Sequence, residues 1–259
     1  MAEKTGLLLV AYGAASSHSA QILRGIGAVA GQRFGLPVRW AYTSEAMRLR
    51  LANARTKSDS VLKALIKMHF ERYAKITVQT LHLIPGLEFS DVLADVEAAR
   101  GKTNLSISIG QPLLPDAAMR EKVARALLRR IPPERAPNEA VVCMAHGSNH
   151  PAETCYIALA GATACLDPLL YVGCMKGSIL LEDIIGKLAK QRVETVWLLP
   201  LLSVTGKHAA EDLGGASPKS WKSQIEGAGY HCRVDFRGLA EFPEFVDLWL
   251  DNLEASLIC

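Results

Sequence analysis

The sequence has no C-x-x-C pair, although six cysteines are spread through its 259 residues. A zinc ribbon or a thioredoxin-like redox site is therefore not supported, and scattered thiols are typical of a reducing compartment. Neither G-x-G-x-x-G nor a Walker motif is present, which argues against a nucleotide cofactor. The longest mostly apolar run, residues 196–204, is too short to cross a bilayer, so no membrane partner is expected.

The chain also lacks a strong excess of charge of either sign. Its formal net charge is +3 and its pI is about 8.5, which is too weak to predict a nucleic acid or a membrane surface as partner. Residues 1–5 lead directly into a strand-like run and no signal peptide is visible, so we expect a cytoplasmic protein. Hydrophobic residues make up 49% of the chain, which is enough for a sizeable core.

What the sequence does contain is a regular alternation of strand-like and helix-like segments. The predicted strands cover residues 6–12, 38–43, 76–84, 105–109, 140–145, 169–174, 195–202 and 231–236. Segments with helical spacing lie between them, which predicts parallel sheets joined by right-handed crossovers. The expected fold class is α/β, with two similar doubly wound parallel-sheet domains facing a central cleft.

The clearest boundary in the chain is rich in proline. Residues 131–140 contain Pro132, Pro133 and Pro137, and this composition is typical of a linker. The boundary predicts an N-terminal domain of residues 1–131 and a C-terminal domain of residues 132–259.

The two halves also align with each other in sequence. Three short segments that follow predicted strands match in order: Tyr12 aligns with His146, Glu45 with Lys176, and Glu88 with His208. A duplicated half-domain is the simplest explanation, and it places three residues of each half on the cleft wall.

Residues 141–148 carry the main functional hypothesis. They form an apolar run that ends at His146 and turns at Gly147, as a buried parallel strand would. Residues at the carboxyl ends of such strands face the crevice where open α/β sheets bind ligands. A turn histidine that only caps the next helix fits the same pattern, and taken alone that reading is at least as good.

Two further histidines follow predicted strands. His208 and His146 together would bind a divalent transition metal through neutral imidazoles or accept protons near neutral pH. His208 by itself also fits a loop residue hydrogen-bonded to backbone. His82 either faces the cleft or packs in the core.

A basic cluster follows the second predicted strand. It consists of Arg48, Arg50, Arg55 and Lys57. Near the cleft it would clamp carboxylates, whereas by default such a cluster is a solvated face.

The ordered motifs resemble those of the class II tetrapyrrole chelatases, and most closely the anaerobic sirohydrochlorin cobaltochelatases of the CbiK type. The resemblance covers nearly the whole chain. The motifs that carry it are residues 7–13, 41–44, 79–88, 111–114, 144–147, 199–208 and 220–222.

The resemblance implies two similar α/β domains with a tetrapyrrole substrate between them. It implies a lyase-class enzyme that inserts Co²⁺ into sirohydrochlorin, or into precorrin-2, in anaerobic cobalamin biosynthesis. His146 and His208 match the first and last members of the family's His, Glu, His metal and catalytic set. The glutamate position falls on Lys176, which departs from the pattern.

Several alternatives stay open at this point. The same site would suit Fe²⁺ or Ni²⁺ as well as Co²⁺. A second alternative is a tetrapyrrole-binding protein in which Lys176 weakens metallation. No haem is predicted, because residues 85–89, where some relatives carry a haem-ligating histidine, contain none. A homo-oligomer is also compatible with the sequence. The candidates for substrate binding are Tyr12, Glu45, Arg48, Arg50, Arg55, Lys57, His82 and Glu88.

Overall fold

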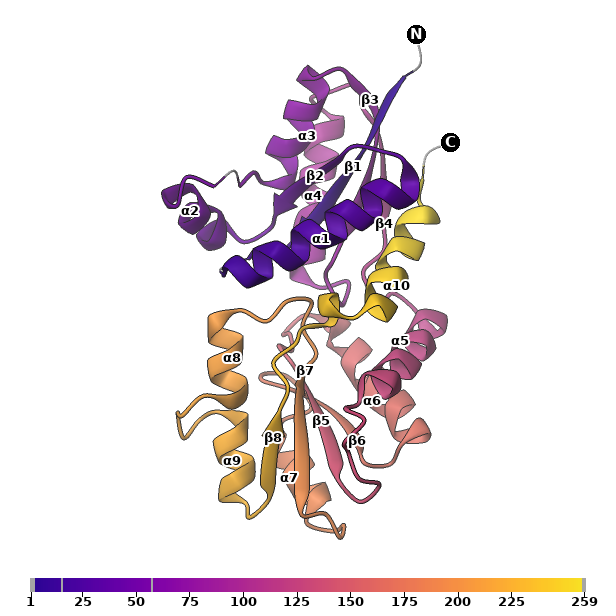
Figure 1. The fold of residues 1–259 in the computed structure, drawn as a ribbon. Helices are drawn as coiled ribbons and strands as arrows, with labels where there is room; N and C mark the ends of the chain where they lie inside the picture. The colour runs from indigo at the N-terminus through magenta and orange to yellow at the C-terminus, as the bar shows by residue number, and fades with distance from the viewer. Residues whose placement is uncertain (1–2, 15, 57, 258–259) are drawn as a thin grey trace. The chain divides into compact units, whose positions relative to one another are not determined.

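The computed structural model describes residues 3–14, 16–56 and 58–257, except for the side chains of Lys207 and His208. It contains two four-stranded sheets, ordered β2-β1-β3-β4 and β6-β5-β7-β8, and every pairing in them is parallel (Figure 1). The first sheet comprises β1 (Lys4–Ala11), β2 (Val38–Tyr42), β3 (Tyr73–Thr80) and β4 (Ser106–Gly110). The second comprises β5 (Ala140–Ala145), β6 (Leu170–Cys174), β7 (Thr195–Pro200) and β8 (His231–Val234).

The two sheets repeat one strand order, so the predicted α/β fold with two similar halves is confirmed. The helices of the first half are α1 (Ser17–Phe34), α2 (Glu45–Asn53), α3 (Val61–Phe70) and α4 (Leu87–Arg100). Those that follow are α5 (Ala117–Arg130), η1 (Pro151–Glu153), α6 (Thr154–Leu166), α7 (Leu181–Leu188), α8 (Lys207–Gly214), α9 (Trp221–Gly227), η2 (Leu239–Glu241) and α10 (Pro243–Glu254).

Central strands in both sheets are apolar because helices cover both of their faces. All six residues of β5 are buried, and Leu7–Val10 of β1 are fully buried. One face of the first sheet packs against α3 and α4, and one face of the second against α7, α8 and α9 (Figure 1). Burial of each leucine side chain in such a layer stabilises the fold by about 1.5–3 kcal/mol. These strands do not alternate between apolar and polar residues. In the sequence they are recognised only as short, continuous apolar runs.

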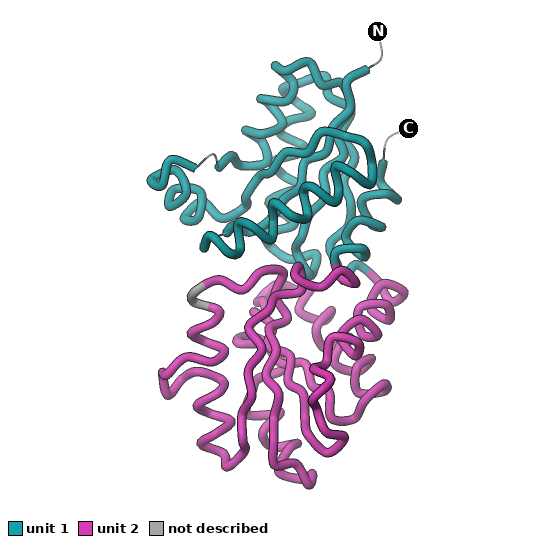
Figure 2. The backbone as a smooth tube through the Cα atoms, viewed as in Figure 1, with its two compact units in different colours: residues 1–115, 246–259 teal, residues 116–245 magenta. Residues whose placement is uncertain are grey.

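The chain divides into two compact units that do not follow the predicted boundary. Residues 1–115 and 246–259 form the first unit, and residues 116–245 form the second (Figure 2). Helix α5 precedes the prolines yet belongs to the second unit, whereas most of α10 returns to the first. The difference has a physical cause, since prolines mark where a helix ends and carry no information on which core it covers.

Specific bonds hold these two helices in their units. The Asn252 side chain of α10 donates to the carbonyls of Gln111 (3.2 Å) and Pro112 (3.0 Å), all within the first unit. Arg130, the last residue of α5, donates to the carbonyl of Pro200 (2.6 Å) in the second. Buried carbonyls need such donors, so each helix is fixed to one sheet.

Two properties expected from composition can be compared with the structure. None of the helices in the described ranges combines the length and apolarity that crossing a membrane requires. The five cysteines within those ranges are free, and two of them, Cys143 and Cys174, are fully buried. Small buried thiols of this kind behave as core residues.

Candidate functional site

His146 is the first residue beyond β5, and it is exposed although every residue of the strand before it is buried. Its Nδ1 lies 3.2 Å from the carbonyl oxygen of Gly147. A carbonyl can only accept, so this bond requires the proton on Nδ1 and leaves the lone pair on Nε2. The imidazole is therefore arranged to bind a metal or to accept a proton through Nε2.

Gly147 brings the loop after β5 against the loop after β6. Its φ is +74°, and a β-carbon at this position would lie 1.8 Å from the carbonyl oxygen of Lys176 and 2.9 Å from Cβ of Cys174. Only glycine tolerates both the left-handed backbone and this approach. The backbones of the two predicted site segments are thus in direct contact.

Lys176 lies in a tight turn between β6 and α7. The turn is closed by a hydrogen bond from the Cys174 amide to the Ile179 carbonyl (2.7 Å), and α7 begins two residues later. The Lys176 side chain is exposed. Cys174 beneath it is fully buried, and burial, followed by the charge and the hydrogen bond of Glu153, raises its thiol pKa to about 12. The thiol stays protonated, which leaves Lys176 as the charged group of the turn.

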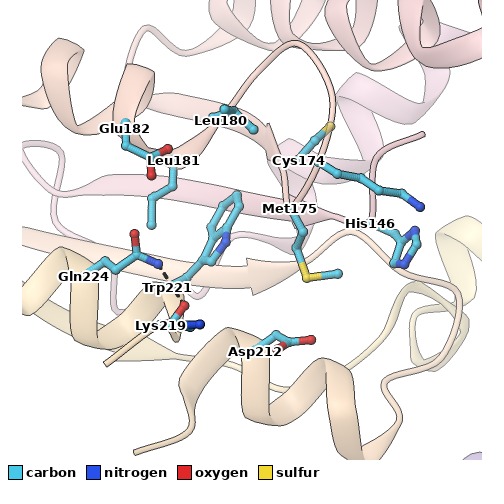
Figure 3. Close-up of a pocket in the computed structure, with 11 residues that line it drawn as sticks. His146, Cys174, Met175, Leu180, Leu181, Glu182, Asp212, Lys219, Trp221 and Gln224 are labelled. Atoms are coloured by element: carbon cyan, nitrogen blue, oxygen red, sulfur yellow. Dashed lines mark hydrogen bonds between the residues drawn. The ribbon is translucent and has the colours of Figure 1, made fainter. Parts of the chain in front are cut away.

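A pocket of about 480 Å³ opens between these loops and the α8–α9 region (Figure 3). Its walls are His146, Cys174, Met175, Lys176, Leu180, Leu181, Glu182, Asp212, Lys219, Trp221 and Gln224. Trp221 forms an apolar wall because Gly173 leaves room for its ring, where a β-carbon would lie 2.9 Å from the indole. Two lysines and two acids line the pocket, so its charges balance overall.

The second predicted metal ligand is only partly described. Residue 208 is the second residue of α8, whose N-cap is Gly206, but its side chain is outside the described part of the structure. Among the side chains that are described, no three of His, Cys, Asp and Glu lie close enough together to hold a metal ion. Pairing of His146 with His208 therefore stays a prediction.

Strand register tests the alignment of the two halves. The amides of Thr43 and Met175 both donate to the carbonyl of the last residue of the central strand, Ala11 or Ala145, at 3.0 Å. Thr43 is therefore equivalent to Met175, and the residue that corresponds to Lys176 is Ser44.

The pairing of Glu45 with Lys176 is consequently wrong by one position. Strands β2 and β6 are both short and mostly apolar. Residue types therefore cannot distinguish the correct alignment from one shifted by a residue, whereas hydrogen bonding can. The other two pairings agree with the strand register. Val10 pairs with Thr80 in the first sheet, and Met144 pairs with Pro200 in the second. Tyr12 and His146 each lie two residues after the first member of these pairs, and Glu88 and His208 each lie eight residues after the second.

His82 is held between two threonines in the first unit. Its Nδ1 contacts the Thr80 hydroxyl and its Nε2 lies 3.3 Å from the Thr43 hydroxyl. Although part of the residue reaches the surface, burial of the ring lowers the pKa of His82 to about 4, and the charge of Glu88 is the smaller, opposing cause. The imidazole is neutral and fixed at neutral pH, as in the packed-core interpretation.

The remaining first-unit candidates occupy different surroundings. Tyr12 follows β1 and is 50% exposed, and Glu45 is the exposed first residue of α2. Glu88 is the second residue of α4 and half-buried. Each of these residues follows a strand of the first sheet, and their binding to substrate stays a prediction.

The basic cluster separates into members with different roles. Arg48 donates to the carbonyls of Tyr42 (2.7 Å) and Thr43 (2.6 Å), so it attaches α2 to the end of β2. Arg50 and Arg55 are exposed, and Arg55 has a φ of +55°. Lys57 lies outside the described residues.

Sequence reasoning missed Glu153, which is 7% exposed and contacts both loops of the site. Its Oε2 accepts from the Ser148 amide (2.7 Å) and its Oε1 from the Ser178 amide (3.0 Å). An acid at a helix start is typical of a solvated first turn, so the sequence held no signal for this role. His150 is the N-cap of η1, where its Nδ1 accepts from the Ala152 amide (3.2 Å).

Comparison with known proteins gives consistent matches. A family model described as cobalt chelatase (CbiK) matches residues 5–258. The chain is 48% identical over 256 residues to the sirohydrochlorin cobaltochelatase CbiKC of Nitratidesulfovibrio vulgaris, covering 98% of this chain and 91% of that protein. It is 29% identical over 206 residues to the sirohydrochlorin cobaltochelatase of Salmonella typhimurium, covering 77% and 75%. The solved structure of SirB from Bacillus subtilis with Fe³⁺ covers 97% of this chain and 94% of its own at a TM-score of 0.71 and 15% identity, which is a likeness of fold.

Proposed function

Because this chain belongs to the cobalt chelatase (CbiK) family, we propose that it inserts Co²⁺ into sirohydrochlorin on the route to cobalamin. The family resemblance found in the sequence and the expectation of a chelatase-class enzyme are both confirmed. The substrate is taken from the name of the 48% identical relative. The observation on this chain that supports the proposal is His146, whose bonded Nδ1 leaves Nε2 to the metal at the edge of the pocket.

The reaction sets two requirements on the site. Metallation replaces two pyrrole N–H protons with one divalent ion, so the protein must deliver the ion and remove protons. A neutral imidazole does either through Nε2, and the Gly147 carbonyl holds the tautomer that makes this possible. We assign the first metal contact and one proton transfer to His146.

His208 is the proposed second metal ligand. Its position eight residues beyond the end of β7 equals that of Glu88 beyond β3, so the fold carries a polar residue at this place in both halves. Two imidazoles would hold the ion from one side while the ring nitrogens replace the other ligands. One of the two would then accept a pyrrole proton.

Lys176 occupies the place where the resemblance implies a glutamate. A protonated amine at ~4 Å from the ion would repel it by about 4 kcal/mol per unit of ion charge at an effective dielectric near 20. We propose that Lys176 lowers the affinity for the metal or turns away from it. This favours a second candidate function, a tetrapyrrole-binding protein whose metallation is weakened by Lys176.

The choice of metal and ring is also part of the proposal. Imidazole ligands suit Fe²⁺ and Ni²⁺ as well as Co²⁺, so the donor set does not select among them. The family and the 48% identical relative favour cobalt. Precorrin-2 is the alternative ring substrate.

One assay separates the candidates. Purified protein is mixed with sirohydrochlorin or precorrin-2 and with Co²⁺, Fe²⁺ or Ni²⁺, and the tetrapyrrole absorption spectrum is followed against a protein-free control. We expect the protein to accelerate metal insertion most strongly with Co²⁺ and sirohydrochlorin. Tight tetrapyrrole binding without any acceleration by any metal would leave the binding protein as the function.

A matched pair of histidine variants assigns the chemistry. His146→Ala should reduce turnover by about 100-fold or more, since it removes a metal contact and a proton acceptor. His231→Ala is the control, because His231 is an exposed residue at the start of β8, at the other end of the same sheet. Near-normal turnover in His146→Ala would remove this residue from the mechanism.

A further inference from the structure

The Glu153 carboxylate bridges the two loops that carry the proposed chemistry. One of its oxygens accepts from the Ser148 amide at 2.7 Å, two residues after His146. The other accepts from the Ser178 amide at 3.0 Å, two residues after Lys176. With one oxygen bonded to each loop and only 7% of the residue exposed, this carboxylate is a buried cross-link between the two loops.

We propose that Glu153 is a positioning residue for metal insertion, which fixes the spacing between the His146 loop and the Lys176 loop. The inference rests on the function proposed above. Glu153 does not line the pocket, so it acts through the backbone of the two loops and makes no contact with substrate.

Close packing makes the loop spacing depend on this carboxylate. At Gly177, where φ is +110°, a β-carbon would lie 2.0 Å from Oε1 of Glu153. At Gly147, a β-carbon would meet the Lys176 carbonyl at 1.8 Å. Each loop therefore has a glycine at its close contact, because a side chain there would collide with the carboxylate or with the other loop. Removal of the bridge would leave two amides of a packed region without their acceptor.

The position of Glu153 in the chain suits this role. It ends η1 and immediately precedes α6, so its backbone is held at the start of a helix, five residues beyond Ser148 and in a different connection from the Lys176 loop. A metal ligand must be placed within about 0.5 Å of its working position, and groups behind the ligand provide that precision. Loss of such a supporting group typically reduces metal affinity or activity 10–100-fold.

The test is Glu153→Gln, which keeps the size of the side chain. The amide nitrogen of glutamine cannot accept, so at least one loop amide loses its partner. We expect kcat/KM for Co²⁺ to fall by about tenfold or more while KM for sirohydrochlorin stays unchanged. Hydrogen exchange of the Ser148 or Ser178 amide should become faster by about tenfold, since bonds to a charged acceptor are strong.

Glu139→Gln is the matched control. The Glu139 carboxylate also joins two segments of the second unit, accepting from the Ala136 amide (3.1 Å) and from Nε1 of Trp197 (2.6 Å). It precedes β5, at the opposite end of the strand from His146. This variant should lose stability without any change in kcat/KM for Co²⁺.

Gly177→Ala tests the same bridge from the other side. The new methyl group would push the Glu153 carboxylate away from the loop without changing its chemistry or charge. The same loss in kcat/KM for Co²⁺ is expected. Its control is Gly186→Ala in α7, where a β-carbon meets nothing within 4 Å.

The outcomes are separable. A wild-type protein that accelerates no metal insertion would overturn the proposed function. An active wild type with unchanged Co²⁺ kinetics in Glu153→Gln would overturn the positioning role alone, and so would unchanged exchange of both serine amides. If Glu153→Gln does not fold, wild-type Co²⁺ kinetics in Gly177→Ala would refute the proposal by themselves.

Discussion

At the scale of the residue, the proposed chemistry depends on a single imidazole. The neutral His146 ring has a fixed tautomer because the partner of its Nδ1, the Gly147 carbonyl, cannot donate. Lys176 lines the same pocket and brings a positive charge where the resemblance implies a negative one. In the proposed function, the balance between these two side chains would decide whether a divalent ion binds.

Lys176→Glu should raise both the affinity for Co²⁺ and the rate of metal insertion. Replacing an ammonium with a carboxylate removes repulsion and adds a ligand, so an increase of at least about tenfold is expected. Metal binding is measured by calorimetry and insertion by absorption. Lys190→Glu, at an exposed position just beyond α7, is the control for net charge. An unchanged or lower rate in Lys176→Glu alone would show that the lysine is not a defect.

His82 should make the stability of the protein depend on pH. Its pKa is about 4 in the folded protein, below its ordinary value of 6.5. Above pH 6.5 the imidazole is neutral in both states, whereas between pH 6.5 and 4 only the unfolded chain takes up the proton. The free energy of unfolding should therefore fall by up to about 3 kcal/mol over this interval and level off below it.

Urea unfolding at a series of pH values measures this effect. His82→Asn should flatten the pH dependence between pH 6.5 and 4, while His231→Asn, at an exposed position, should leave it as in the wild type. Equal slopes in wild type and His82→Asn would contradict the assignment.

Contact between two loops is the feature that matters at the scale of the element. Each loop follows a strand of the same parallel sheet, β5 or β6, so their starting points are neighbours by construction. Their final approach depends on Gly147 and Gly177, which both have positive φ. The geometry of the site therefore depends on the loops after both β5 and β6, and neither loop alone forms it.

Gly147→Ala should disrupt this contact. The alanine would adopt an unfavourable φ and its β-carbon would force the Lys176 carbonyl away, at a cost of about 3 kcal/mol or more. Thermal unfolding measures the loss, and metal insertion should fall with it. Gly161→Ala in α6 is the control, where a β-carbon meets nothing and up to about 1 kcal/mol of stabilisation is expected. Equal stability of the two variants would show that the loops are free to separate.

At the scale of the whole molecule, the chain builds its first unit from both of its ends. Residues 116–245 form a continuous second unit, and the C-terminal segment completes the first. Trp249, Leu250 and Leu253 of α10 are fully buried, and Asn252 bonds to the segment after β4. A cut at the prolines would separate α5 from α6, against which it packs, and from the Pro200 carbonyl that Arg130 binds.

Fragments should report this division directly. Residues 116–245 should unfold in one cooperative transition by circular dichroism and remain monodisperse in size-exclusion chromatography. Residues 132–259 lack α5 and carry the apolar face of α10 without its partners, so they should aggregate. Comparable folding of both fragments would contradict the observed division.

Much of this protein follows from its sequence alone. Apolar runs such as residues 141–145 predicted the parallel strands, because a strand covered on both faces must be apolar throughout. The strand-end position of His146 and the ordered motifs led to the chelatase family without coordinates. Local patterns determine elements and their order, since they depend on residues a few positions apart.

Tertiary structure decided what depends on distant partners. The register of β1 and β2 moved the counterpart of Lys176 to Ser44, and packing assigned α5 and α10 to their units. Only the fold turned Glu153 from an acid at a helix start into a bridge between loops. A side chain's role is set by which donors, charges and surfaces meet it after folding, and neighbours in sequence do not encode those.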